Sequence, residues 1–326
     1  MIDVIYISGV LNESHLVYVA SFINKIKNEG NFNFAIYYEN NSRFLSSAKI
    51  HTSIIEKWLG KVNYVKPGKS IRAGYRKEIL HLFIGSVGIK PVLLMRKSNI
   101  TCKISNIVID EGIGSASDIH TMQKVYMRER KINSFKAYLY AFIYFYLKRG
   151  VLAKQTWRLF DGLKPNQQIM DFIKAKSVPI KYDNTSYMLL LTQPWVKLGI
   201  LTEDEYKDYI SNIISEANAL KLKLIVKPHP SEDFQLYENL GLNVIDTLTP
   251  VELCFDFDNC FAVIGFNSTS LILLNAIYNT PAFRLSFEKI DSVVSCSRLQ
   301  ESLFNKYTSQ RMSIIDIFNE LSISEH

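Results

Sequence analysis

The sequence predicts an α/β protein with two Rossmann-like, doubly wound lobes that face a central cleft. Short apolar strand-like runs alternate with amphipathic helical patterns, and this alternation occurs twice with a more polar stretch between. A chain of 326 residues is long enough for two separate cores. Its 48% apolar and 21% charged residues are typical of a globular protein and argue against disorder.

The first alternation predicts an N-terminal lobe over residues 1–165. Strand-like runs occur near 2–8, 33–38, 62–66, 90–96 and 105–110, and helical patterns lie between the first four at 16–27, 42–59 and 71–83. The stretch that follows is polar and contains Pro165, Pro179 and Asp183-Asn184. It predicts a linker over 166–186.

The second alternation predicts a C-terminal lobe over 187–326. Strands are expected at 187–191, 222–226, 260–264 and 281–285, and helices at 202–218 and 269–278. The helix after Thr202 opens with three acids, which favour the positive end of a helix dipole. Two such lobes indicate a GT-B-like architecture, in which the C-terminal lobe normally holds the nucleotide.

Positive charge is concentrated in the segment 120–165. It holds ten lysines and arginines and only two acids, Glu129 and Asp161, with six aromatic residues between 138 and 146. An aromatic centre with basic flanks suits a helix lying on an anionic membrane face, or a site for an acidic polymer. The alternative is a buried helix with lysines at its ends. No nucleic-acid motif accompanies the charge, so no nucleic-acid partner is expected.

The location predicted from the sequence is cytoplasmic. The four cysteines are scattered without metal or redox spacing, which is typical of reduced thiols. The N-terminus lacks the basic start and cleavage site of a signal peptide. The longest apolar run, 137–147, is shorter than the roughly 20 residues that a membrane-spanning helix needs.

The acidic motif, Asp110-Glu111-Gly112, follows the apolar strand that ends at Ile109. The carboxyl ends of strands are where ligands bind in open α/β sheets. A carboxylate there can take a proton from a hydroxyl group that becomes a nucleophile. We expect Glu111 to be this base and Asp110 to order the turn. The alternative is that both acids only form the turn.

The histidine motif, Lys227-Pro228-His229-Pro230, also follows an apolar strand. Each proline fixes its own φ and restricts the residue before it, so the imidazole is held with little freedom left to lose. Such an imidazole can donate a hydrogen bond or a proton to a phosphate, and Lys227 adds positive charge. A stiff surface turn is the alternative.

The hydroxyl motif, Asn267-Ser268-Thr269-Ser270, opens a predicted apolar helix. A helix N-terminus presents unpaired backbone N–H groups and partial positive charge, which suit an anion. Hydroxyl groups at that point add donors to a phosphate. The alternative is ordinary helix capping by serine or threonine.

Together, the acidic, histidine and hydroxyl motifs resemble those of bacterial sialyltransferases. The likeness is greatest to the bacterial polysialyltransferase family and the related lipooligosaccharide sialyltransferases. The strand that ends in Gln193-Pro194 is similar to the opening of their donor-binding lobe. The resemblance implies inverting, metal-independent transfer from CMP-sialic acid to a hydroxyl of a cell-surface glycan, such as lipooligosaccharide or capsule, without a cofactor.

The resemblance also implies roles for individual residues. His229 would bond or protonate the phosphate of the leaving nucleotide, and Ser268, Thr269 and Ser270 would share its charge. Glu111 would deprotonate the acceptor, while Gln193 and Pro194 would line the nucleotide side. The other residues expected to bind substrate are Asp110, Gly112, Lys227, Pro230 and Asn267.

Some residues near these motifs receive weaker assignments. His15 is a candidate acceptor contact, and Asn12 is expected to cap a helix. Asp256-Phe257-Asp258 has the spacing of a metal–nucleotide pair, but the phenylalanines around it suggest a helix end, so no metal site is expected.

Two other classes of function stay open from the sequence. One is a transferase in surface-polymer synthesis that uses another CMP-linked keto sugar or a CDP-linked polyol. The other is a non-catalytic nucleotide- or glycan-binding protein. The expected partners are a CMP-sugar donor, an oligosaccharide acceptor that is lipid-linked, and the anionic inner face of the membrane.

Overall fold

The computed structural model of the protein describes residues 2–30, 33–40, 49–85, 90–180, 185–245, 249–254 and 258–324. The chain divides into two compact units, Met1–Phe172 and Ile173–His326. Each unit holds its own six-stranded sheet. The chain passes between the units inside the range 166–186, where residues 167–176 form a helix.

The first unit is a doubly wound parallel sheet in the order β3-β2-β1-β4-β5-β6. Its strands are β1 Val4–Ser8, β2 Ala35–Glu39, β3 Asn63–Val65, β4 Glu78–Ile84, β5 Lys103–Ile109 and β6 Gln155–Trp157. Its helices are α1 Glu13–Glu29, α2 Thr52–Leu59, α3 Lys90–Ser98, α4 Ile119–Arg130 and α5 Ser134–Phe142, and α6 Gln167–Lys176 crosses the division between the two units. A 3-10 helix η1 Ile113–Ala116, a π-helix η2 Ile143–Leu152 and a short hairpin of β7 Phe160–Asp161 and β8 Lys164–Pro165 complete it.

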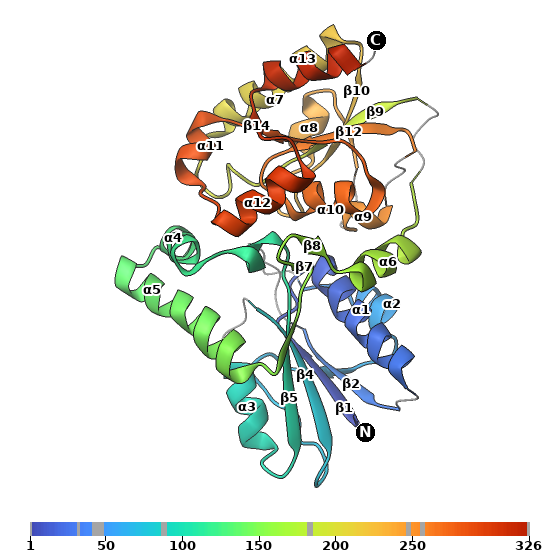
Figure 1. The fold of residues 1–326 in the computed structure, drawn as a ribbon, viewed down its shortest axis with the longest axis vertical. Coiled ribbons are helices and arrows are strands. Elements are labelled where there is room, and N and C mark those ends of the chain that lie inside the picture. The colour runs from blue at the N-terminus through green and yellow to red at the C-terminus, as the bar shows by residue number, and fades with distance from the viewer. Residues whose placement is uncertain are drawn as a thin grey trace. The chain divides into compact units, whose positions relative to one another are not determined.

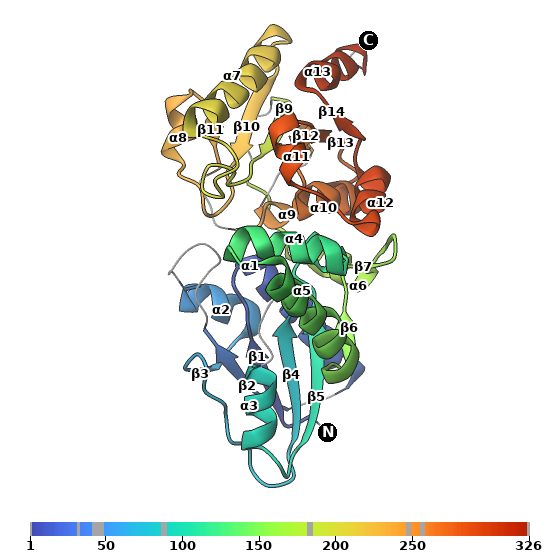
Figure 2. The ribbon, with the colours of Figure 1, turned by 90° about the vertical axis from the view of Figure 1, so that its left-hand side faces the viewer.

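Helices cover both faces of this sheet. Figure 1 shows α1 and α2 on one side and α3 and α5 on the other. On the α3 side, Val92 of α3 and Leu152 of η2 pack against Phe83 and Val108 of the central strands. Figure 2 shows α4 beside α5, which continues into η2. This side of the sheet therefore carries the basic, aromatic segment.

Two predicted elements of the first unit were wrong in type. Residues 78–84 form β4 although a helix was expected over 71–83, and residues 90–98 form α3 although a strand was expected over 90–96. All but the first residue of β4 are buried, so its apolar run has no polar face to reveal a strand period. Pro91 lies in the first turn of α3, where its missing N–H costs no hydrogen bond.

The other predicted elements of the first unit were confirmed in type at strands β1, β2, β3 and β5 and at α1. The helix expected over 42–59 is observed only from Thr52, and residues 41–48 lie outside the described part. In the range 166–186, Ile169, Met170 and Ile173 lie buried at helical spacing along α6. No helix of the described ranges is long and apolar enough to cross a membrane.

The second unit repeats the same winding in the order β11-β10-β9-β12-β13-β14. Its strands are β9 Tyr187–Leu191, β10 Lys223–Lys227, β11 Asn243–Val244, β12 Cys260–Gly265, β13 Ala282–Leu285 and β14 Arg311–Met312. The helices are α7 Glu203–Ala219, α8 Gln235–Asn239, α9 Val251–Cys254, α10 Thr269–Tyr278, α11 Glu288–Val293, α12 Arg298–Tyr307 and α13 Ile314–Ser324. The predicted strands and helices of this lobe were confirmed.

Alternation along β9 divides the core of the second unit. Met188 and Leu190 pack on the side of α7 and α13, whereas Tyr187, Leu189 and Leu191 pack on the side of α10. Figure 1 shows these helices on opposite sides of the sheet. A strand buried on both faces places its carboxyl end, and the loop that follows, in a fixed position.

Candidate functional site

The acidic motif lies at the carboxyl edge of the first sheet. The strand register pairs Ile109 of β5 with Ile84 of β4 and Trp157 of β6, so these strands end together. Gly112 has a φ of 109°, a backbone conformation that residues with a Cβ rarely adopt. The glycine therefore lets the chain turn sharply just after the two acids.

Asp110 anchors this edge through protein partners. Its side chain is 7% exposed, with Oδ1 at 3.1 Å from Arg149 Nη2 and Oδ2 accepting the Leu159 N–H at 3.0 Å. Its own N–H donates to the Trp157 carbonyl. Burial raises the pKa of Asp110 to about 6, against the opposite effect of Arg149. These contacts agree with a role in ordering the turn.

Glu111 is held at three points. Its Oε1 accepts a hydrogen bond from the Tyr144 hydroxyl at 2.7 Å, and its N–H donates to Ser115 Oγ at 3.1 Å. The imidazole of His15 hydrogen-bonds the Glu111 backbone. A half-buried carboxylate with a defined orientation, at the end of a buried strand, is suited to act on a substrate hydroxyl.

His15 supports the acidic motif from α1. It is buried, burial lowers its pKa to about 4, and its Nδ1 accepts the Leu11 N–H at 3.3 Å. Asn12 caps α1 by accepting the His15 N–H at 2.9 Å, which confirms its predicted role. The structure thus gives His15 contacts to the loop that carries the proposed base.

Three predicted loops come together at the carboxyl edge of the second sheet. Lys227 of β10 and Gly265 of β12 both pair with Leu191 of β9. A Cβ at Gly265 would lie 2.9 Å from the Leu191 carbonyl oxygen, so glycine permits the close approach of β12 to β9. Gln193-Pro194, the histidine motif and the hydroxyl motif therefore follow adjacent strands.

The imidazole of His229 is fixed by the residues after it. Its Nδ1 accepts the Ser231 N–H at 3.3 Å and lies 2.7 Å from Ser231 Oγ. The neutral ring therefore carries its proton on Nε2. Burial, with Lys227 and Lys197 nearby, lowers the pKa of His229 to about 4. At neutral pH the ring is an uncharged donor through Nε2.

Glu232 holds the histidine loop to β9 and α7, and sequence reasoning missed it. One carboxylate oxygen accepts the Thr192 hydroxyl at 2.5 Å and the His229 N–H at 2.8 Å. The other accepts the hydroxyls of Tyr237 at 2.7 Å and Tyr206 at 3.3 Å. Burial raises the pKa of Glu232. The only sequence signal was an acid three residues after the histidine.

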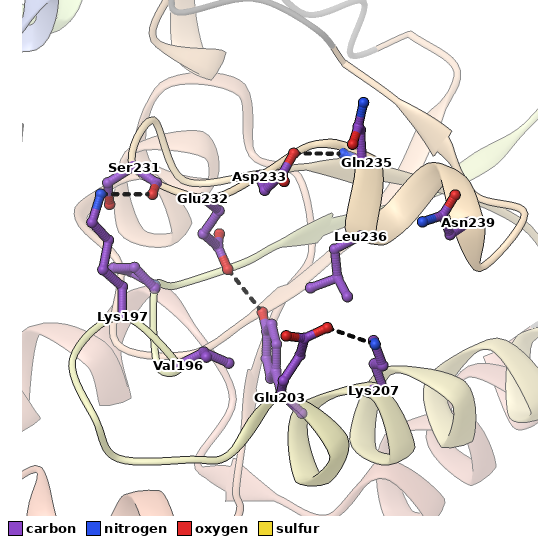
Figure 3. Close-up of a pocket in the computed structure, with 12 residues that line it drawn as sticks. Val196, Lys197, Glu203, Lys207, Ser231, Glu232, Asp233, Gln235, Leu236 and Asn239 are labelled. Carbon is purple, nitrogen blue, oxygen red and sulfur yellow. Dashed lines mark hydrogen bonds and ion pairs between the residues drawn. The ribbon is translucent and has the colours of Figure 1, made fainter.

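A pocket of about 370 Å³ opens beside this loop. Figure 3 shows Glu232 and Lys197 near Ser231 on one side and the Glu203–Lys207 ion pair of α7 on another. Pro194 and Tyr206 also line it. The predicted residue Pro194 thus borders a hollow, whereas Pro230 is exposed and Lys227 is buried.

The hydroxyl motif lies at the start of α10, and its side chains make different hydrogen bonds. Ser268 is the N-cap residue, yet its side chain makes no capping hydrogen bond. The Ser270 hydroxyl donates to the buried carboxylate of Glu252 at 3.1 Å. Asn267 Oδ1 accepts from Nε of Arg284 at 2.7 Å, and this buried arginine also pairs with Glu301. The helix start is therefore braced by residues that the sequence did not single out.

Metal ligands do not gather in the described part of the chain. Among those residues, no group of three or more His, Cys, Asp or Glu could hold an ion. Residues 255–257 lie outside the described ranges, and with them most of the Asp256-Phe257-Asp258 segment.

Comparisons with known proteins identify relatives of the chain. A family model described as alpha-2,8-polysialyltransferase matches residues 5–286. The GT-B domain of a sialyltransferase from Photobacterium damselae is 13% identical, with 96% of this chain and 99% of that chain covered and a TM-score of 0.52. A putative UDP-N-acetylglucosamine 2-epimerase from Listeria monocytogenes is 9% identical, with 100% and 88% covered and a TM-score of 0.59. A UDP-GlcNAc 2-epimerase from Methanocaldococcus jannaschii is 11% identical, with 99% and 92% covered and a TM-score of 0.52. No curated protein matches the chain. At these identities the solved structures establish the fold alone, and they confirm the predicted GT-B-like class.

Proposed function

The chain belongs to the alpha-2,8-polysialyltransferase family, and from this premise we propose that it catalyses inverting, metal-independent transfer from CMP-sialic acid to a hydroxyl of a cell-surface glycan. Membership establishes a sialyltransferase, with a nucleotide-sugar donor and a glycan acceptor. The proposal adds the donor identity, the stereochemical course, the independence from metal, and lipooligosaccharide or capsule as the acceptor. Its main support is the meeting of the histidine and hydroxyl motifs at one sheet edge.

The donor half of the proposal rests on charge development at the leaving phosphate. As the glycosidic bond breaks, negative charge grows on CMP and must be stabilised. His229 is an oriented donor through Nε2, and the N-terminus of α10 adds backbone N–H groups with Ser268 and Thr269. Such preorganised donors require no metal ion.

The acceptor half rests on Glu111 as the general base. Its carboxylate would remove the proton from the acceptor hydroxyl as that oxygen attacks the anomeric carbon from the face opposite to CMP. Attack from that face inverts the configuration. The hydrogen bond from Tyr144 holds the carboxylate, and the contacts with Ser115 and His15 hold the backbone of this base.

The deciding experiment measures CMP release and product mass with CMP-sialic acid and a panel of short glycans, with and without EDTA. Another CMP-linked keto sugar and a CDP-linked polyol serve as competing donors. Glu111→Gln and His229→Ala should each lower turnover at least a hundredfold. Glu29→Gln and His120→Ala, which change exposed residues, should retain it. Full activity in both site variants, or activity only with added metal, would overturn the proposal.

We further propose that the enzyme docks on the anionic inner face of the membrane through α5 and η2. One side of this helix packs Ala137, Ala141 and Tyr144 inward. Exposed apolar residues line the remainder, among them Phe135 at 78% exposed and Tyr146 at 57% exposed. Clustered exposed aromatics of this kind mark an interaction surface.

The basic residues around these exposed aromatic side chains favour an anionic lipid bilayer as the binding partner of this surface. Arg130 stacks on Tyr126 and Tyr140, so its guanidinium lies at the aromatic face, and Lys131 and Lys136 are exposed nearby. Aromatic rings at headgroup depth with cations around them suit an anionic bilayer.

Flotation with anionic and zwitterionic vesicles at low salt tests this docking. The wild-type protein should float with anionic vesicles, and Phe135→Ser with Tyr146→Ser should weaken that binding at least tenfold. Ile100→Ser, at a residue that is 85% exposed outside the segment, is the control. Absence of vesicle binding would refute docking, and binding to a soluble acidic glycan instead would assign the surface to the acceptor.

A further inference from the structure

We infer that Tyr144 is the positioning residue for Glu111, and that its phenol holds the carboxylate in the orientation that receives the acceptor proton. The inference rests on the proposed role of Glu111 as base. It concerns a residue in the centre of the aromatic segment, where the sequence indicated only a surface or a core helix. Its basis is the hydrogen bond from the Tyr144 hydroxyl to Glu111 Oε1 at 2.7 Å.

The environment of Tyr144 makes the phenol a permanent donor. The side chain is 1% exposed, and burial together with the nearby charge of Glu111 raises its pKa well above the ordinary value. The hydroxyl therefore stays protonated across the working range of pH. A rigid, buried ring that donates to one oxygen restricts the rotation of the Glu111 side chain.

The π-helical geometry of η2 explains how this segment reaches the acidic motif twice. Tyr144 donates to Glu111, and Arg149, five residues later, pairs with Asp110. In an α-helix, residues five apart point about 140° away from each other, because each residue turns about 100°. A π-helix bonds residues five apart and so places them on one face. The Arg149 guanidinium accordingly lies 5.1 Å from the centre of the Tyr144 ring.

Gly85 gives a second, independent indication that the structure leaves space for the Tyr144 hydroxyl. A Cβ at this position would lie 2.9 Å from the Tyr144 hydroxyl oxygen, and 3.4 Å from the nearest ring carbons. Only the oxygen would be too close. The end of β4 thus provides the space that the hydroxyl needs to reach Glu111.

A double-mutant cycle tests the inference. Tyr144→Phe should lower kcat roughly ten- to a hundredfold, the rate equivalent of one hydrogen bond to a charged group, and leave KM for the donor unchanged. Gly85→Ala should lower kcat comparably by displacing the hydroxyl. In the Tyr144→Phe background, Gly85→Ala should have less than a twofold effect, because the oxygen that it would displace is gone.

The controls separate positioning from structure. Tyr75→Phe removes the hydroxyl of a tyrosine that is 70% exposed and lies outside α5 and η2, and it should leave kcat unchanged. Thermal unfolding of each variant shows whether assays were made on folded protein. A wild-type kcat in Tyr144→Phe, or an undiminished effect of Gly85→Ala in that background, overturns the inference.

The result is also distinguishable from a failure of the proposed function. If Glu111→Gln is inactive while Tyr144→Phe is fully active, Glu111 keeps its role and only the positioning inference fails. If Glu111→Gln is fully active, the base is wrongly assigned.

Discussion

Replacing Glu232 with alanine should loosen the loop that carries His229 and lower both stability and donor binding. The carboxylate accepts short hydrogen bonds from Thr192, His229 and Tyr237, and a longer one from Tyr206. Its partners are buried or half-buried, so they cannot all turn to water.

The size of the stability loss depends on which of the hydrogen-bond donors to Glu232 can find new acceptors. The hydroxyls of Tyr206 and Tyr237 lie 2.9 Å apart and can bond each other, so one of them stays satisfied. The His229 N–H keeps only Thr192 Oγ1, at 3.3 Å. An unsatisfied buried donor costs about 1–3 kcal/mol, whereas removal of a buried carboxylate also relieves its desolvation. We expect a net loss of about 2–3 kcal/mol for Glu232→Ala.

Glutamine at this position should cost less, about 1 kcal/mol. Its oxygen can still accept the His229 N–H, and its amide can donate to the tyrosine hydroxyls, which rotate to accept. Urea unfolding measures the free energy of unfolding of each variant. The KM for CMP-sialic acid shows whether the loop that carries His229 still binds the donor. Glu238→Ala, at an exposed acid on α8, should stay within about 0.5 kcal/mol of wild type. Equal stability and KM in Glu232→Ala and Glu238→Ala would refute the reasoning.

Three more predictions concern pH, packing and the imidazole. His81 is fully buried, and burial lowers its pKa from 6.5 to about 4, so the stability that it contributes is present above pH 6.5 and is lost as pH falls toward 4. Between pH 7 and pH 5, wild type should lose about 2 kcal/mol more than His81→Gln; equal losses in urea unfolding would contradict this. Gly265→Ala should cost about 1–3 kcal/mol because the new Cβ meets the backbone oxygen of Leu191, whereas Gly74→Ala, which meets only a lysine side chain at 3.8 Å or more, should be tolerated. Ser231→Ala removes the hydroxyl that lies 2.7 Å from His229 Nδ1 and should raise the KM for the donor about threefold, while the ring keeps its proton on Nε2 because the Ser231 N–H still donates to Nδ1; an unchanged KM, or a ¹⁵N spectrum of the other tautomer, would count against it.

Local patterns predicted most of the second unit. The strand β9 and the helix α10 were predicted with the bounds that the structure gives them, and α7 begins directly after Thr202. Thr202 and Glu205 form a capping box, a signal contained in four adjacent residues. In the first unit, β4 was mistaken for a helix because a strand buried on both faces shows no alternation.

The positions of the acidic, histidine and hydroxyl motifs were determined by the sequence alone, because a polar cluster directly after an apolar strand is a local feature. Their partners were decided only by the tertiary structure. Tyr144 lies 33 residues from Glu111, and Thr192 lies 40 residues from Glu232. Contacts over such distances depend on strand register, on crossover helices and on the π-helical turn of η2. These features arise from packing between elements, and no single stretch of sequence encodes them.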